Sequence, residues 1–142
     1  IVRGEGGFGS PVKAKEVWAP PDRAPDYIVS YHVPIQQALV YRLSGDVNPL
    51  HSDPKAAGEA GFERPILHGL CTYGYTARAL LKALCDFNAG SFGYMAARFS
   101  TPVIPGETLT IRIWDEGNAA QFQAYVGNRL VLDRGKFRRR AA

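Results

Sequence analysis

A chain of 142 residues, 46% of them hydrophobic, is long enough to fold as one domain with its own core. It has no uninterrupted apolar run near the ~18 residues that a membrane span needs, so we expect a soluble domain. Five lysines and arginines lie among residues 134–140, and subtracting them from the net charge of +4 leaves −1 for the rest of the chain. This placement favours a solvated or phosphate-contacting tail over a nucleic-acid-binding face.

The first 25 residues differ in composition from the rest of the chain. Glycine and proline are frequent there, which predicts an extended connector or arm. The chain begins Ile1-Val2-Arg3, with neither an initiator methionine nor a signal-like apolar block. We therefore interpret it as a piece of a longer polypeptide whose folded part begins near residue 26.

Hydrophobic spacing predicts the elements that follow. Alternation over residues 26–33 predicts a strand. Pro34 can begin a helix, and a helix-compatible pattern over 35–43 ends at Gly45. After a short loop, an N-cap aspartate followed by proline predicts a second, short helix within residues 53–60.

The rest of the chain predicts one long helix and then a meander. Apolar residues three and four apart predict the longest helix, over residues 69–86. Near residue 90 the hydrophobic period changes to two, which predicts strands over about 92–102, 107–115, 119–127 and 129–137. An α+β fold follows, with an antiparallel sheet curled around the long helix over residues 26–137, and with residues 138–142 as a basic tail.

Two cysteines lie on the predicted long helix. Fourteen residues separate Cys71 from Cys85, which is roughly 21 Å of helical rise and too far for a disulfide. Neither has an obvious activating base beside it, so we interpret both as buried structural thiols.

The string from residue 41 to residue 51 is the most informative part of the sequence. It brings Asp46, Asn48 and His51 together, and Gly45 and Pro49 make the backbone around them non-helical. A carboxylate and an imidazole this close can share one water molecule as a base and an acid, which suits the addition of water to a double bond. Asn48 can orient a water or a ligand carbonyl. The alternative is structural, with Asp46 capping a turn and His51 on the surface.

A second string, at residues 64–70, precedes the predicted long helix. Gly69 lacks a Cβ, so a ligand oxygen can approach its backbone N–H closely at the positive end of the helix dipole. Such an N–H can hold a developing negative oxygen. His68 is equally compatible with a hydrogen-bonded core histidine.

Other kinds of site fit these residues less well. The spacing of Asp46, His51, Asp53 and His68 matches no known metal-ligand pattern, so we expect no metal. A triad with Ser44 would lack the nucleophile elbow that such hydrolases have.

The two strings resemble the hydratase 2 family, the MaoC-like R-specific enoyl-CoA hydratases with a hotdog fold. Tyr41 and the stretch from Gly45 to His51 match the first motif of that family, and the stretch from Pro65 to Gly69 matches the second. The resemblance covers roughly residues 26–137. It is strongest to the branch in which two hotdog units lie in one chain and only the second carries the motif, like the hydratase unit of peroxisomal multifunctional enzyme type 2.

The resemblance implies hydration of a trans-2-enoyl-CoA to a (3R)-3-hydroxyacyl-CoA, in β-oxidation or related acyl-CoA metabolism. It implies catalytic roles for Asp46, His51 and Asn48, with the N–H of Gly69 in the oxyanion hole. The implied substrate-binding residues are Tyr41, Leu50 and His68. No cofactor is expected, since coenzyme A is part of the substrate. Which of Asp46 and His51 is the acid stays open.

Two rival functions remain at this stage. One is a hotdog thioesterase or acyl-carrier-protein dehydratase, and the other is a non-catalytic module that binds acyl thioesters. A lone hotdog sheet leaves an edge strand exposed, so we expect pairing with a second hotdog unit, from the same chain or from another copy. The resemblance places the protein in the cytoplasm if it is bacterial and in the peroxisome if it is eukaryotic.

Overall fold

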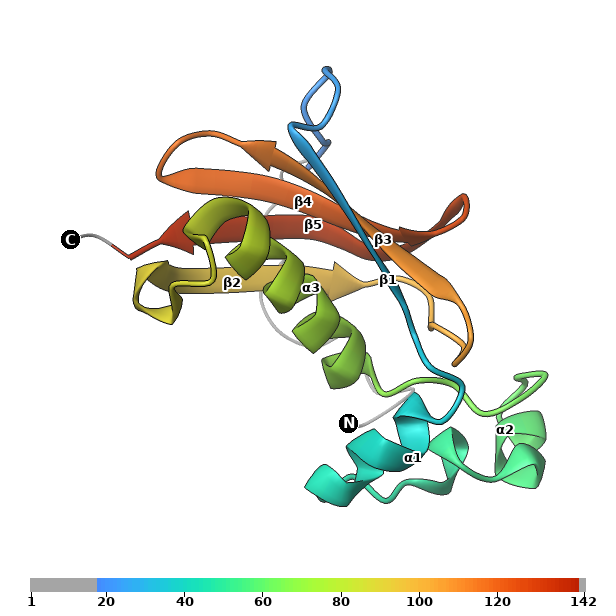
Figure 1. Cartoon of the computed structure of the whole chain (residues 1–142). Coiled ribbons are helices and arrows are strands. Elements are labelled where there is room, and N and C mark those ends of the chain that lie inside the picture. Colours follow the sequence, from blue (N-terminus) through green and yellow to red (C-terminus); the bar gives the residue numbers. More distant parts are fainter. Residues whose placement is uncertain (1–17, 141–142) are drawn as a thin grey trace, which may run out of the picture.

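The computed structural model describes residues 18–140, and in them five antiparallel strands curl around one long helix (Figure 1). The strand order across the sheet is β1-β3-β4-β5-β2, so β1 and β2 are the two edges. The strands span β1 Tyr27–His32, β2 Phe92–Phe99, β3 Thr108–Asp115, β4 Ala119–Val126 and β5 Arg129–Arg139. The predicted α+β hotdog architecture is confirmed.

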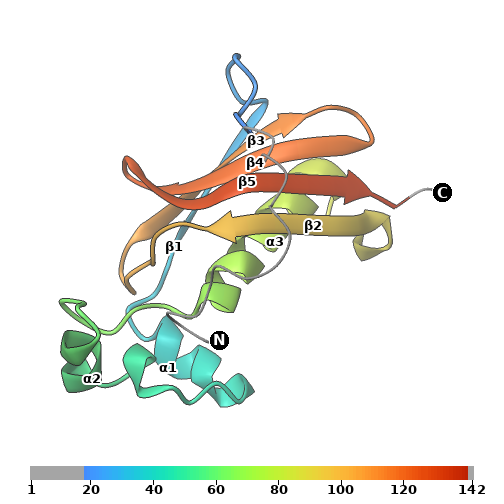
Figure 2. The same cartoon turned by 180° about the vertical axis from the view of Figure 1, so that it is seen from behind.

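Helix α3, Gly69–Cys85, lies across the concave face of the sheet, and strands of the sheet pass in front of part of it when the molecule is seen from behind (Figures 1 and 2). The core between them consists of fully buried side chains from β3, β4 and β5, among them Ile111, Ile113, Phe122, Leu132 and Phe137. Burial of this apolar area, at about 25 cal/mol per Å², is what holds the helix in the curl.

The buried face of α3 includes Leu80 and Leu84 of the apolar stripe that the sequence pattern indicates, but it differs from that stripe in the first half of the helix. Leu70 is 66% exposed, whereas Thr72 and Thr76 are 2% and 0% exposed. The Thr76 hydroxyl donates to the Thr72 carbonyl 3.0 Å away, so its burial leaves no donor unsatisfied. Small side chains on this face let the helix lie close to the sheet.

The shorter helices gather at one end of the sheet, beside the start of α3 (Figure 1). Helix α1, Gln37–Tyr41, continues into a 3-10 turn over Arg42–Ser44, and a second 3-10 turn spans Pro49–His51. Helix α2, Pro54–Glu59, begins at Asp53, whose carboxylate accepts the N–H of Lys55 at 2.8 Å. The first predicted helix is therefore shorter than expected, and a turn completes it.

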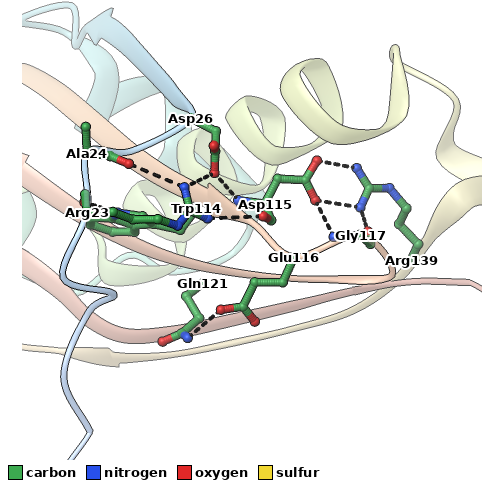
Figure 3. A network of polar contacts seen from close by, with 9 residues as sticks. All are labelled: Arg23, Ala24, Asp26, Trp114, Asp115, Glu116, Gly117, Gln121 and Arg139. Carbon is green, nitrogen blue, oxygen red and sulfur yellow. Dashed lines mark hydrogen bonds and ion pairs between the residues drawn. The ribbon is translucent and has the colours of Figure 1, made fainter.

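Strand β5 runs two residues further than expected, so the predicted basic tail at 138–142 begins too early. Arg138 and Arg139 belong to the sheet. The Arg139 guanidinium contacts both carboxylate oxygens of Asp115, at 3.0 and 3.1 Å, and donates to the carbonyls of Gly117 and Leu84 (Figure 3). These partners on β3, its hairpin and α3 hold the end of β5 in place.

The predicted connector also contacts the sheet where the structure describes it, from residue 18 onward; residues 1–17 lie outside the described range. The Trp114 indole donates to the Arg23 carbonyl at 2.9 Å, and Arg23 bonds the Asp26 carboxylate at 2.7 Å (Figure 3). That guanidinium holds the pKa of Asp26 below its usual range. Residues 23–25 are thus tied to β3 rather than free.

Both cysteines are free and buried in the core, as predicted. Burial raises the pKa of each thiol above its ordinary value. Within residues 18–140, no helix combines the length and the apolar character needed to cross a bilayer.

Gly135 lets β5 pass close to β4. It pairs with Phe122, and a Cβ built on Gly135 would lie 2.2 Å from the Phe122 carbonyl oxygen and 2.5 Å from its ring. Since Phe122 is fully buried, neither group has room to move. Only a residue without a side chain fits at this position.

We predict that Gly135→Ala lowers the free energy of unfolding by about 3 kcal/mol, because the added methyl group overlaps backbone and core atoms. Gly58→Ala is the matched control, since Gly58 is exposed on α2 with nothing within 4 Å of an added Cβ. It should raise stability by up to about 1 kcal/mol through helix propensity. Urea unfolding of both variants measures this, and equal effects would contradict the close approach.

Candidate active site

The loop of residues 46–51 is shaped by its own side chains. Gly45 ends the preceding 3-10 turn with φ +112°, a conformation that favours glycine. Asp46 then accepts the backbone N–H of Asn48 at 3.3 Å, and the Asn48 side-chain oxygen accepts that of Leu50 at 3.0 Å. These bonds cap the 3-10 turn that carries His51, and they leave the Asn48 amide nitrogen free to donate to a ligand.

Three hydrogen bonds join this loop to the segment before α3, and two of them pair a histidine of one motif with a backbone carbonyl of the other. The Nδ1 of His51 lies 2.8 Å from the Ile66 carbonyl oxygen. In return, the Nε2 of His68 lies 3.1 Å from the Asp46 carbonyl oxygen. We call these the reciprocal histidine bonds. They bring together the two motifs that the sequence keeps apart.

The first of these bonds fixes the protonation pattern of His51. A carbonyl oxygen only accepts, so Nδ1 carries the hydrogen of the neutral ring and Nε2 carries the lone pair. His51 is 9% exposed, and the ring lies at the wall of two pockets. Its Nε2 is therefore available to accept a proton from a bound water.

The Asp46 side chain lies close to both histidine rings. Polar side-chain atoms of Asp46, His51 and His68 all lie within 4.8 Å of one another. A single water with two hydrogen bonds of about 2.8 Å can span such a gap between a carboxylate and an imidazole. The three groups could equally offer oxygen and nitrogen ligands to a metal ion, an arrangement that the sequence spacing did not indicate.

His68 lies behind His51 rather than in a pocket. It is 1% exposed, and its ring stacks on that of His51 with centroids 3.8 Å apart. Burial is the main cause that lowers the pKa of His68, which keeps the ring neutral near pH 7. A direct contact of His68 with a substrate stays a prediction.

Gly69 is the first residue of α3 and is exposed. At the start of α3 the N–H groups of Cys71 and Thr72 donate to the His68 carbonyl, at 3.1 and 3.2 Å, whereas the N–H of Gly69 has no acceptor within residues 18–140. The N-cap residue His68 makes no side-chain cap because its ring turns toward Asp46. A Cβ on Gly69 would lie 3.2 Å from the Phe99 ring. The missing side chain thus leaves room for Phe99 beside an uncapped helix start.

Two pockets flank His51. One of about 270 Å³ also reaches Gly69, Thr72 and Phe99, and the loop after β2 forms its far wall. The other, of about 220 Å³, lies toward α1 and is lined by Leu39, Arg64 and other residues. Because His51 borders both, a ligand at its Nε2 could extend to either side.

Tyr41 and Leu50, the other expected substrate contacts, lie near the site and are half-buried. The Tyr41 ring contacts His68, with centroids 4.8 Å apart. The backbone carbonyl of Leu50 accepts the N–H of Ile66 at 3.4 Å. Both therefore support the two motifs, and a contact with substrate stays a prediction.

Sequence reasoning missed the loop of residues 100–106, which lines both pockets. The Arg129 guanidinium bonds the Glu107 carboxylate at 2.6 and 2.7 Å and also donates to the Pro102 carbonyl. Glu107 in turn accepts the N–H of Ile104 at 2.8 Å. An arginine and a glutamate 22 residues apart give no sequence signal of this contact, although Pro105-Gly106 marks the turn.

Comparison with known proteins agrees with this geometry. A family model described as "MaoC like domain" matches residues 16–133, which is most of the chain. The chain belongs to the MaoC-like family. Both motifs, helix α3 and strands β1 to β4 fall within the matched residues, as does the start of β5.

Relatives of this MaoC-like chain are named as hydratases or as parts of multifunctional enzymes. It is 53% identical over 116 residues to enoyl-CoA hydratase ChsH3 of Mycobacterium tuberculosis, covering 82% of this chain and 41% of that protein. It is 48% identical over 129 residues to peroxisomal multifunctional enzyme type 2 of mouse, covering 89% and 18%. The MaoC-like chain thus spans less than half the length of either relative.

Solved structures show the same architecture. The full-length peroxisomal multifunctional enzyme type 2 of Drosophila melanogaster matches with a TM-score of 0.84 and 42% identity, over 92% of this chain and 25% of that one. The resemblance of the MaoC-like chain to such enzymes therefore holds in three dimensions as well as in sequence.

Proposed function

We propose that this MaoC-like domain hydrates trans-2-enoyl-CoA thioesters to (3R)-3-hydroxyacyl-CoA and catalyses the reverse dehydration. The observation that carries the proposal is that polar side-chain atoms of Asp46 and His51 lie within 4.8 Å of each other. His51 also lines the pocket that reaches the helix start at Gly69. The names of relatives, such as peroxisomal enoyl-CoA hydratase 2 of Arabidopsis thaliana, support the same substrate class.

In this proposal a water molecule sits between Asp46 and His51. One group of the pair takes a proton from the water as its oxygen bonds to the β-carbon, and the π electrons of the double bond move toward the thioester oxygen. A proton from the same pair then reaches the α-carbon on the same face. The lone pair on His51 Nε2 favours that nitrogen as the first acceptor.

The thioester oxygen gains negative charge as the double bond opens. The uncapped N–H of Gly69 and the dipole of the 17-residue helix α3 stabilise that charge. One such donor typically contributes ~3 kcal/mol to the transition state. Asn48 holds the loop in place through its oxygen and can orient the water through its nitrogen.

These steps need no cofactor beyond the coenzyme A of the substrate. Addition of water to the double bond transfers no electrons to or from another molecule, so the reaction needs no oxidant or reductant. Several relatives are named as peroxisomal proteins, while others are bacterial. We propose a peroxisomal location if the chain is eukaryotic and a cytoplasmic one if it is bacterial.

A second hotdog unit completes this site in our proposal. Asp46 is exposed, and the large apolar side chains near it, Leu43, Val47 and Leu70, are 85%, 63% and 66% exposed. Such a patch beside a polar site, together with two sheet edges that pair with no further strand among residues 18–140, marks a surface that a partner covers. The partner is either another part of a longer chain or a second copy.

The function is tested by identifying the product formed from crotonyl-CoA. We expect (3R)-3-hydroxybutyryl-CoA, the enantiomer that R-specific hydration gives, and the (3S) enantiomer would contradict the proposal. Release of free coenzyme A without a hydroxylated product would favour the thioesterase alternative. Binding without any turnover, measured by calorimetry, would favour a non-catalytic module.

We predict that Asp46→Asn and His51→Ala each lower kcat for crotonyl-CoA by about 10²–10⁴-fold, the range typical of acid–base groups. Asp53→Asn is the control, because Asp53 lies in the same stretch of sequence but caps α2. It should keep its turnover. Circular dichroism shows whether each variant is folded, and near-normal turnover in folded Asp46→Asn or His51→Ala contradicts the assigned roles.

We also predict that the active species contains two hotdog units. Light scattering should give about twice 15.5 kDa for this chain alone, or a monomer if the full-length protein carries both units. An active, strictly monomeric 15.5 kDa species would show that one unit suffices.

A further inference from the structure

His68 is the histidine of the site that the proposed chemistry does not use. It is 1% exposed, and its Nδ1 has no hydrogen-bond partner. Its Nε2 donates to the Asp46 carbonyl oxygen at 3.1 Å, since a carbonyl can only accept. Burying a polar ring with one nitrogen unsatisfied lowers the free energy of unfolding, and a phenylalanine or leucine in the same space would avoid this loss of stability.

The ring of His68 fixes two neighbours at once. Its edge holds the backbone of Asp46, and its face stacks on His51 with a centroid distance of 3.8 Å and an interplanar angle of 26°. His51 is held from the other motif by Ile66. The carboxylate and the imidazole that share the water thus have His68 as a common support.

We propose that His68 is a positioning residue, whose Nε2–H bond to the Asp46 carbonyl and whose ring face against His51 set the distance between the carboxylate and the catalytic imidazole. This inference rests on the proposed hydration for its effect on turnover. The geometric part does not depend on the reaction. A misplacement of about 1 Å at such a pair can cost about 10²-fold in rate.

The role requires a neutral His68. A proton on Nδ1 would put a buried charge where no acceptor lies, against the stacked His51. Burial and the nearby His51 and Arg42 lower the pKa of His68, while the Asp46 carboxylate and carbonyl act in the opposite direction; Tyr41 is the other titratable neighbour.

This lowered pKa gives the sign of a pH effect. Between the lowered value and the ordinary value of about 6.5, the unfolded chain binds more protons than the folded one. The free energy of unfolding therefore rises with pH across that window and falls when the pH drops below about 6.5. The dependence should become weaker in any variant that lacks the His68 imidazole.

Two substitutions separate the functions of the ring, and they are made in the full-length protein. His68→Phe keeps a flat ring but removes the donor to Asp46, whereas His68→Gln keeps an amide donor but removes the ring. We expect about 100-fold lower kcat in His68→Phe and a smaller loss, about 10-fold, in His68→Gln, with KM within about threefold of wild type in both. His32→Gln, on exposed β1, is the control and should not change turnover.

A spectroscopic readout tests the geometry without activity. With only three histidines in the chain, nitrogen NMR of labelled imidazoles can be assigned by substitution. We expect His68 at pH 7 to be neutral with its hydrogen on Nε2, and the His51 ring signals to shift in folded His68→Phe but not in His32→Gln.

The outcomes separate the two proposals. Unchanged His51 signals and a kcat within threefold of wild type in folded His68→Phe would overturn the positioning role. A His68 that titrates near 6.5 would overturn it as well. If the His51 signals shift as expected while the wild-type protein hydrates no enoyl-CoA, the positioning role stands and the proposed function fails.

Discussion

The reciprocal histidine bonds are the contact on which the site depends. The loop of residues 46–51 is short and largely exposed, and it makes no ladder with the sheet. What fixes it is an exchange of two side-chain hydrogen bonds, from His51 to the carbonyl of Ile66 and from His68 to that of Asp46, beside the backbone bond from the Ile66 N–H to the Leu50 carbonyl. Each bond is buried or partly buried, where the loss of one partner leaves the other unsatisfied. The loop is therefore ordered in part by His51, which is also one of the two groups proposed to carry its chemistry.

The sheet and α3 determine where this exchange takes place. Burial of Ile111, Phe122 and Leu132 beneath α3 fixes the helix, and hence the position of its first residue, Gly69. The segment before Gly69 is in turn tied to the loop after β2, since the N–H of Leu67 donates to the Val103 carbonyl at 2.7 Å. Core packing thus places the N–H donor of Gly69 in the same pocket as an imidazole, His51, from a segment some twenty residues away.

Much of this was predictable from the sequence, for definite reasons. Hydrophobic period gave the position of every strand and of α3, because alternation and three-to-four spacing report which side chains face a core. Dense motifs pointed to Asp46, His51 and Gly69. The carbonyls of Ile66 and Asp46 were not predictable, since a backbone oxygen has no residue type of its own. The burial of Thr72 and Thr76 was not predictable from the spacing of apolar residues, because both side chains are polar. The extra length of β5 was not predictable either, because it depends on a contact of Arg139 with the distant Asp115.

The two buried thiols have a practical consequence for anyone who labels or assays the protein. Cys71 and Cys85 are 6% and 7% exposed, and burial raises the pKa of both, so little thiolate meets solvent while the chain is folded. A disulfide reagent added to follow coenzyme A release would therefore react with the thiol of the released coenzyme A and not with the two cysteines of the folded chain. By the same reasoning, a cysteine engineered onto the surface would be the one fast-reacting handle for a fluorophore or spin probe.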